Sequence, residues 1–336
     1  HKNFLIALGI TDLAGNRPSE VLWSSPADIG SIPPSWDIAD PAEQAGAYEL
    51  ADTPGIILDG KNLGDSFIIY KEDSVWAMDF IGGNFTFQFR QLFEDREGLI
   101  ATGCVAEFEG KHFVLSKNDA YVHDGITKKS VMEGRTQTAL ASIDPNYRDK
   151  TRVVTDHRNQ EILIYFVSAN SLTGLADTCA SWNWVTDSWT YREVQEVSHM
   201  DEGFVDLEGA GETWDEDDQP WDEDTTVWNE GVENLTSTSL IVADYTNSRL
   251  LRLNTGTTWD GEEYATLFEH VGTDFGERSI NKRVNAIYPY LEGTQGTVVN
   301  IEVGYEMVPG GGVRWDGPSP FPVGAAAGVT WAWKTP

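Results

Sequence analysis

The sequence predicts an all-β protein. Its apolar residues seldom recur at the helical spacing and instead form short runs rich in β-branched and aromatic side chains. Gly, Asn and Asp bound these runs, which is the pattern of strands joined by turns. Hydrophobic residues make up 40% of the 336 residues, with 13 Trp, 14 Phe and 11 Tyr in the chain. We therefore expect a substantial core, in one large all-β domain or in two domains.

Two segments repeat one pattern and indicate how the strands are grouped. Residues 67–79, FIIYKEDSVWAMD, align with residues 113–124, FVLSKNDAYVHD, and the segments begin 46 residues apart. Each reads as an apolar strand, a polar turn with Lys-x-Asp, and a second strand. This spacing is close to the period of a propeller blade, a small antiparallel sheet that must stack on its neighbours. The sequence predicts a β-propeller of four or five short antiparallel blades with long irregular insertions and additional C-terminal β-strands; a β-sandwich is the alternative.

Further strand–turn–strand units are expected along the chain. NFLIALG (3–9) and EVLWSS (20–25) read as two strands joined across the turn NRPS. EILIYFVSANS (161–171) and SLIVADYTNSRLLRLN (239–254) repeat the same theme.

The connection at residues 25–46 is longer than blade closure requires. It is rich in Pro, so we expect a stiff, extended loop rather than a flexible tether. Long ordered loops on a rigid scaffold commonly contact partners, which makes this loop a candidate interface. Short helices are expected near Pro41–Leu50 and Arg135–Ile143.

The chain is expected to divide into two parts. Residues 1–272 would form the blades, with an acidic Trp-repeat insertion at about 201–233. Residues 273–336 would form C-terminal strands and a Gly/Pro-rich aromatic tail, as a platform or interface domain. The aromatic side chains of the tail predict that it docks on another surface. The candidate contact residues in the tail are Trp315, Trp331 and Trp333.

The charge of the chain is strongly negative. With 54 acidic and 23 basic residues, its formal net charge is −31. Such a surface repels nucleic acid and anionic membranes, and adaptation to a saline habitat is the alternative explanation. No apolar stretch is long enough for a transmembrane helix, so no membrane span is expected. Two cysteines make no disulfide framework, and the start at His1 suggests a piece of a longer protein.

The acidic excess is densest around a tryptophan repeat. In ETWDEDDQPWDEDTTVWNE (212–230), Trp214, Trp221 and Trp228 recur every seven residues, each followed by an acidic pair or by Asn-Glu. Pro220 and the clustered Asp disfavour a helix. An odd period would place successive Trp side chains on opposite faces of a flat strand. We therefore interpret the repeat as a series of turns that each pack one Trp onto the propeller.

A calcium site is the competing interpretation of this repeat. Its candidate oxygen ligands are Asp215, Asp217, Asp222 and Asp224. An EF-hand loop, however, needs Gly at its sixth position for the sharp turn, and Pro220 stands there. The structural interpretation is favoured, and no metal or other cofactor is predicted.

The sequence carries none of the compact motifs of common catalytic sites. Its 6 His lack the HExxH spacing, GGGV (310–313) lacks the Lys-Ser/Thr of a phosphate loop, and G-x-S-x-G is absent. The Asp box of sialidase-like propellers is missing as well, and NTGTTWDG (254–261) matches it only in part. No catalytic residue is assigned, and His157 in TDHRNQ is expected in a hairpin turn.

Several stretches resemble virion proteins of short-tailed bacteriophages, in particular the β-propeller-bearing nozzle or tail-hub proteins. The first comprises residues 144–167 and 180–194: an Asp-Pro-x-Tyr start, an apolar strand, and a hairpin that carries Trp184 and ends on Trp189. The second is the acidic Trp repeat. The third is KRVNAIYPYLEGTQGTVVNIEVG (282–304), which is similar to their late paired strands joined by a Gly-rich turn.

The resemblance implies a non-enzymatic structural protein of a phage tail. It would be a homo-oligomer, a ring of six copies around the channel for genome ejection, beside the tail adaptor and tail fibre or spike proteins. It would be assembled in the host bacterial cytoplasm and reside in the virion. An acidic wall suits such a channel, because Lys and Arg on phosphates would hold the DNA, so genomic DNA would pass without specific binding.

The alternative function is a carbohydrate-binding or glycosidase-like β-propeller for host-surface recognition. Exposed Trp with nearby Asp would suit the faces and hydroxyls of sugars. The two functions differ in whether Trp214, Trp221 and Trp228 pack against protein or line an open groove.

Overall fold

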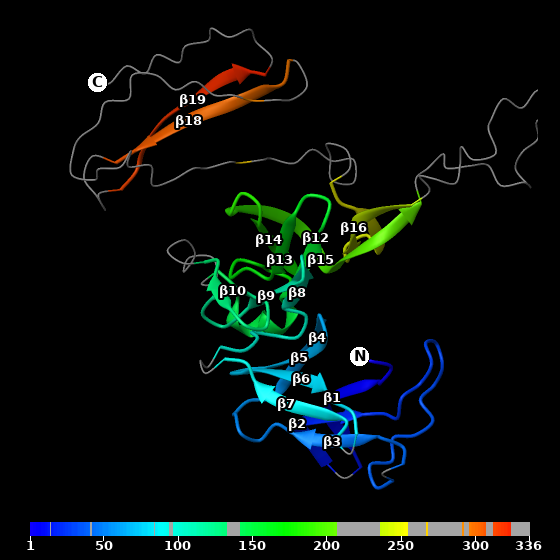
Figure 1. The fold of residues 1–336 in the computed structure, drawn as a ribbon. Coiled ribbons are helices and arrows are strands. Elements are labelled where there is room, and N and C mark those ends of the chain that lie inside the picture. Colours follow the sequence, from blue (N-terminus) through cyan, green and yellow to red (C-terminus); the bar gives the residue numbers. More distant parts are fainter. Residues whose placement is uncertain are drawn as a thin grey trace, which may run out of the picture. The chain divides into compact units, whose positions relative to one another are not determined.

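The computed structural model consists almost entirely of antiparallel strands (Figure 1). The described residues are 1–13, 15–40, 42–83, 85–93, 97–132, 142–206, 236–254, 267, 291, 296–306 and 312–323. The chain divides into two compact units, His1–Tyr264 and Ala265–Pro336. The predicted all-β class, with short antiparallel blade-like sheets and additional C-terminal strands, is confirmed.

The described residues of the first unit form four successive sheets, each built from strands that are consecutive in the sequence. The first sheet comprises β1 (Ile6–Asp12), β2 (Gly15–Trp23) and β3 (Gly46–Glu49). The second comprises β4 (Ile57–Leu63), β5 (Ser66–Lys71), β6 (Val75–Phe80) and β7 (Phe87–Gln91). The third comprises β8 (Val105–Phe108), β9 (Lys111–Leu115), β10 (Ala120–His123) and β11 (Lys128–Ser130).

The fourth sheet has six strands and follows a short 3-10 helix, η1 (Pro145–Lys150), which Asp144 caps. Its strands are β12 (Arg152–Asp156), β13 (Glu161–Phe166), β14 (Ala176–Asn183), β15 (Ser188–Asp206), β16 (Thr236–Asp244) and β17 (Arg249–Arg252).

The turns of the third and fourth sheets share one local chemistry. In each of four hairpins, an Asp or Asn at the end of a strand accepts backbone N–H groups two or three residues further on, which stabilises the turn. These side chains are Asp124, Asp156, Asn183 and Asp244. This is why Asn and Asp bound the apolar runs of the sequence.

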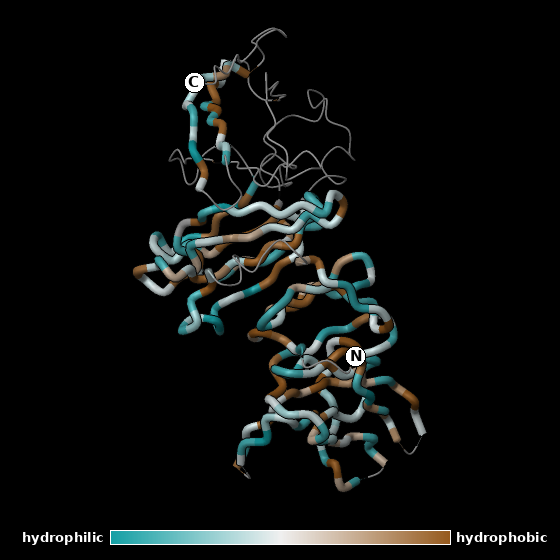
Figure 2. The backbone as a smooth tube through the Cα atoms, turned by 90° about the vertical axis from the view of Figure 1, so that its left-hand side faces the viewer, coloured by the Kyte–Doolittle hydropathy of each residue, from teal (hydrophilic) through white to brown (hydrophobic). Residues whose placement is uncertain are grey.

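The sheets stack so that a central strand is buried on both of its faces. Alternate side chains of a strand face opposite sides of its sheet. In β5, Ile68 and Tyr70 join a core shared with the third and fourth sheets, whereas Ile69 joins a core shared with the first sheet. In Figure 2, apolar stretches follow the strands of these sheets. The apolar run FIIY in the sequence is continuous because other sheets pack against both faces of this strand, so that neither face is exposed to solvent.

The fourth sheet folds back over itself. Strand β15 pairs with β14 as far as Val197 and with β16 from Val197 onward, and the pairing register breaks on both sides of this residue. The second half of β15 packs against β13, where Leu163 and Tyr165 share a core with Met200. The other face of β13, with Ile164, packs toward the third sheet.

The two matched hairpins, β5–β6 and β9–β10, occupy the same middle position in their four-stranded sheets, as the repeat predicts. Residues that occupy equivalent positions in the two hairpins are shifted by one residue from the pairs that the sequence alignment matches. The N–H of Lys71 donates to the Ser74 carbonyl, and the N–H of Ser116 donates to the Asp119 carbonyl. Buried Lys71 thus corresponds to buried Ser116, whereas Lys117 lies partly exposed on its turn.

The predicted N-terminal hairpin forms, but its turn was misplaced. Strands β1 and β2 turn between Asp12 and Gly15, and NRPS lies within β2. The ladder breaks between Leu8 and Ile10, close to Pro18. Proline has no N–H for a ladder bond and occurs in strands at such irregularities, so this Pro marks a bulge rather than the turn.

The helix predicted near Pro41–Leu50 is wrong. Gly46–Glu49 is the edge strand β3, which pairs with β2. Cross-strand pairing has overridden the local preference of this short segment. Of the helix predicted at Arg135–Ile143, residues 135–141 lie outside the described residues, and Ile143 forms a β-bridge with Ser168.

The acidic insertion predicted at about 201–233 begins later than expected. Residues 201–206 belong to β15 and pair with β16, with Asp206 opposite Thr236. The segment 207–235 lies outside the described residues. The described residues that flank it, Asp206 and Thr236, pair at the end of the β15–β16 ladder.

In the second unit, β18 (Val298–Tyr305) pairs with β19 (Arg314–Pro322) as a two-stranded ribbon. The partner of β18 within the described residues comes from the tail. The first of the paired strands predicted inside residues 282–304 falls in 282–295, of which only Leu291 is described, so that pairing stays a prediction. Pro320 and Pro322 alternate along β19, so the side of this strand away from β18 lacks N–H donors at these positions.

Candidate functional site

A buried polar network lies in the core between the second and third sheets. The hydroxyl of Tyr70, on β5, lies 2.8 Å from Nδ1 of His112 and 2.7 Å from Nε2 of His123. The other nitrogen of His112, Nε2, lies 2.8 Å from the Asn62 carbonyl, and Nδ1 of His123 accepts the N–H of Gly125. All three side chains are buried.

These contacts determine where the protons lie. A carbonyl accepts only, so His112 carries its proton on Nε2, and its Nδ1 accepts from the Tyr70 hydroxyl. His123 accepts a backbone N–H at Nδ1, so its Nε2 donates to the same hydroxyl. Each ring nitrogen thus makes one hydrogen bond and the hydroxyl makes two, in a chain of neutral groups.

Burial keeps the network neutral. Desolvation lowers the pKa of His112 to about 4. Desolvation, and then the neighbouring His112, lower the pKa of His123 to about 3, and burial raises the pKa of Tyr70 well above its usual value. Neither imidazole is poised near neutral pH as a general base would be. The arrangement fastens the two sheets together rather than offering reactive groups.

A second buried polar contact fixes the segment before β4. The ammonium of Lys71 lies 2.7 Å from the Leu50 carbonyl and 2.5 Å from the Thr53 carbonyl. Its side chain is buried, and desolvation lowers its pKa. The ammonium donates to backbone carbonyls at both ends of residues 50–53, so this lysine holds the conformation of that segment.

Two of the predicted tryptophans pack inside the first unit. Trp189 lies opposite Trp182 in the β14–β15 hairpin, and its indole N–H donates to the Val131 carbonyl at 3.1 Å. Trp184 donates to Glu109 at 3.1 Å. Both pack against the core of the second, third and fourth sheets. They join the fourth sheet to the third within one chain, and both side chains are partly buried.

The remaining predicted tryptophans are distributed differently. Trp315 lies on β19 with 52% of its surface exposed. The other predicted contact residues lie outside the described residues, as do the acids weighed as calcium ligands. These are Trp214, Trp221, Trp228, Trp331 and Trp333, and Asp215, Asp217, Asp222 and Asp224.

The loop after β2 is held in place yet presents apolar side chains to solvent. The backbone and hydroxyl of Ser25 exchange three hydrogen bonds with the backbone of Ser35. Within the loop thus closed, Ile29 and Ile32 are 98% and 90% exposed, and Ile38 follows at 55%. Ordered backbone with exposed large apolar residues is typical of a contact surface.

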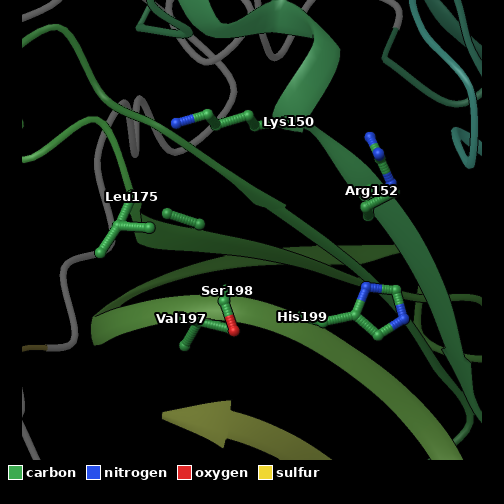
Figure 3. A pocket seen from close by; sticks show the side chains of 7 residues that line it. Lys150, Arg152, Leu175, Val197, Ser198 and His199 are labelled. Atoms are coloured by element: carbon green, nitrogen blue, oxygen red, sulfur yellow. The ribbon is translucent and has the colours of Figure 1, made fainter. Parts of the chain in front are cut away.

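A hollow of about 220 Å³ lies at the bend of β15 (Figure 3). Lys150 and Arg152, from the end of η1 and the start of β12, lie on one side of it. Ser198 and His199, from β15, lie on the other. Apolar groups complete its wall: Leu175, Ala176 and Val197.

Sequence reasoning missed this hollow because its residues come from three separate segments. The one local signal is that Lys150 and Arg152 are two nearby cations in a strongly acidic chain. His157, by contrast, lies in the β12–β13 turn as predicted, 2.7 Å from a carboxylate oxygen of Glu202.

Among the described residues, no group of three His, Cys, Asp or Glu is arranged to hold a metal ion. Within the same residues, no helix is both long enough and apolar enough to cross a membrane.

No family model matches the chain. No curated protein matches it either. Among solved structures, the chain is similar to the N-terminal domain of Nup159, at 11% sequence identity, with 75% of this chain and 81% of that chain covered. The TM-score is 0.26, a likeness too loose to carry an argument, so the fold is assigned from the strands of the chain itself.

Proposed function

We propose that this chain is a non-enzymatic structural subunit of a bacteriophage tail, which assembles with copies of itself into a ring around the DNA channel. The proposal unites the sequence resemblance with a scaffold of stacked sheets and an exposed apolar loop. The single observation that carries it is the closed loop 26–34, in which Ile29 and Ile32 face solvent.

The loop supports an assembly function because its shape is fixed before any partner arrives. The hydrogen bonds between Ser25 and Ser35 close the loop. The N–H of Ala27 donates to the Asn3 carbonyl at 2.9 Å, which connects the loop to the N-terminal segment. A preorganised loop loses little conformational freedom on binding, so more of the gain from burying Ile29 and Ile32 remains as affinity.

The core supports a scaffold because buried hydrogen bonds join its successive sheets. The Tyr70 hydroxyl joins His112 and His123, and Asp59 on β4 accepts the N–H of Gly103 at 2.8 Å. Such contacts hold successive sheets in a fixed relation, as a load-transmitting subunit requires.

The charge of −31 supports a channel through which DNA moves without being held. Duplex DNA binds through phosphate contacts with Lys and Arg, which are scarce here. In this proposal the neighbours are the tail adaptor and the tail fibre or spike proteins, and the ring has six copies.

The test is the mass of the purified protein, measured by native mass spectrometry and by low-resolution imaging. We expect a ring-shaped oligomer. Ile29→Asp with Ile32→Asp should dissociate it while leaving the unfolding temperature unchanged, because neither side chain is packed.

The matched control is Leu172→Asp, which places the same charge at a fully exposed position on the β13–β14 connection. It should leave the oligomer intact. A wild-type protein that is monomeric at all concentrations, or a double variant that assembles as well as the wild type, would contradict the proposed assembly surface.

A further inference from the structure

We propose that the hollow at the bend of β15 binds a small oxyanion, a phosphate or carboxylate group, through Lys150, Arg152 and His199. This site is independent of the proposed tail function.

The hollow exists because two strand ladders break at the same place. The β14–β15 register shifts between Ala176 and Thr178, and the β15–β16 register shifts between Val197 and His199. Regular strands alternate their side chains between faces, yet Ser198 and His199 are adjacent and both exposed. Bulges re-aim side chains in this way and are frequent at functional sites.

The two cations of the hollow contact neutral groups, and the ammonium of Lys150 lies 4.7 Å from the centre of the Tyr147 ring. The ammonium of Lys150 donates to the Gly174 carbonyl at 2.5 Å, and Nη1 of Arg152 donates to the Asp149 and Thr151 carbonyls at 2.5 Å and 2.8 Å. Within the part of the chain that the structure describes, neither forms an ion pair with a carboxylate. Carbonyl contacts fix the position of a cation without neutralising it.

Acidic residues outnumber basic ones by 54 to 23, yet the side-chain contacts of these two cations are with neutral groups. Two cations on one wall of a hollow, with neutral side chains and an imidazole opposite, leave the charge of a bound anion as the missing partner.

Size and hydrogen-bond capacity narrow the ligand class. A volume of about 220 Å³ lies below the roughly 300–1,000 Å³ of drug-sized ligand pockets, so a single small group fits better than a nucleotide or an oligosaccharide. The Ser198 hydroxyl already donates to the Ala243 carbonyl at 3.1 Å. Binding therefore relies on Lys150, Arg152 and the Nε2 atom of His199, since Nδ1 of this ring lies 3.3 Å from the Tyr165 hydroxyl.

The test is calorimetric titration of the full chain with inorganic phosphate and, separately, with acetate, at constant ionic strength set with NaCl. We expect saturable binding. Saturation by both anions would assign general oxyanion recognition, and saturation by phosphate alone would assign a phosphate group; either supports the site.

Lys150→Gln and His199→Gln should each weaken binding by at least fivefold, and Arg152→Gln by more. The matched control is Lys117→Gln, which removes the same charge from an exposed turn outside the hollow. Arg152 also packs against Gly103, so its substitution can affect folding. If the Arg152 variant is unstable, the anion affinity of Lys150→Gln is the test of the site. Absence of saturable binding by either anion, or equal weakening in the Lys117 control, would overturn the site.

Discussion

The hydroxyl of Tyr70 lies 2.8 Å from Nδ1 of His112, and this hydrogen bond connects the second strand of one sheet to the second strand of the next. It is buried, and both partners have their remaining polar atoms satisfied. Removing the hydroxyl would leave ring nitrogens of both His112 and His123 without a partner.

We therefore expect Tyr70→Phe to lower the free energy of unfolding by about 2 kcal/mol or more, since each buried polar group left unpaired costs about 1–3 kcal/mol. Urea denaturation measures this. Tyr48→Phe, at an exposed position stacked on Phe89, is the control and should cost little. Equal effects of the two substitutions would show that the network contributes nothing specific.

Stability should fall as the pH falls below about 6.5. The pKa values of His112 and His123 are lowered to about 4 and about 3 in the folded state, so between these values and 6.5 the unfolded chain binds more protons. The stability that the two neutral histidines contribute to the folded state is fully present above pH 6.5. It is lost as the pH falls toward the pKa values of the folded state. The free energy of unfolding, measured from pH 7 to pH 5, gives the slope of stability against pH before most carboxylates titrate. Replacing both residues by Gln should flatten the slope, and an unchanged slope in that variant would assign it to other groups.

Trp189→Ala should destabilise the first unit by about 3 kcal/mol, at the lower end of the range for truncating a packed aromatic side chain because Trp189 is half-buried. Its indole also donates to the Val131 carbonyl, which would be left without this partner. Trp315→Ala, at an exposed position on β19, is the control and should leave the same transition unchanged. Thermal denaturation followed by circular dichroism compares the two.

The two thiols should be unreactive in the folded protein. Burial raises the pKa of Cys104 to about 12 and that of Cys179 to about 11, so almost no thiolate forms at pH 8. A chromogenic disulfide reagent should modify both only at the rate of unfolding. Val185→Cys, at an exposed turn position, provides a thiol that should react at once. Rapid modification of the wild-type thiols would mean that the core opens more often than its packing implies.

Local patterns in the sequence were sufficient for the features that neighbouring residues determine. The β5–β6 and β9–β10 hairpins and the His157 turn all form where apolar runs meet turn residues. The all-β class follows from the same runs, because their short length and β-branched content leave no long amphipathic helix.

Features that depend on distant partners were not predictable. Gly46–Glu49 becomes a strand only because the edge of β2 is available. The fold-back of β15 follows from core contacts between Tyr165 and Met200, and the hollow follows from that fold-back. The one-residue offset between Lys71 and Lys117 shows that two similar sequences can place the same residue type in a core or on a turn.

The prolines of β19 have a consequence for self-association. A cross-β fibre grows when every added chain offers hydrogen-bonding edges on both of its sides. At Pro320 and Pro322, the outer side of β19 has carbonyls but no N–H to pair with an incoming strand. A further strand that approached this side of β19 would therefore lack two hydrogen-bond donors, which disfavours the growth of a fibre in that direction.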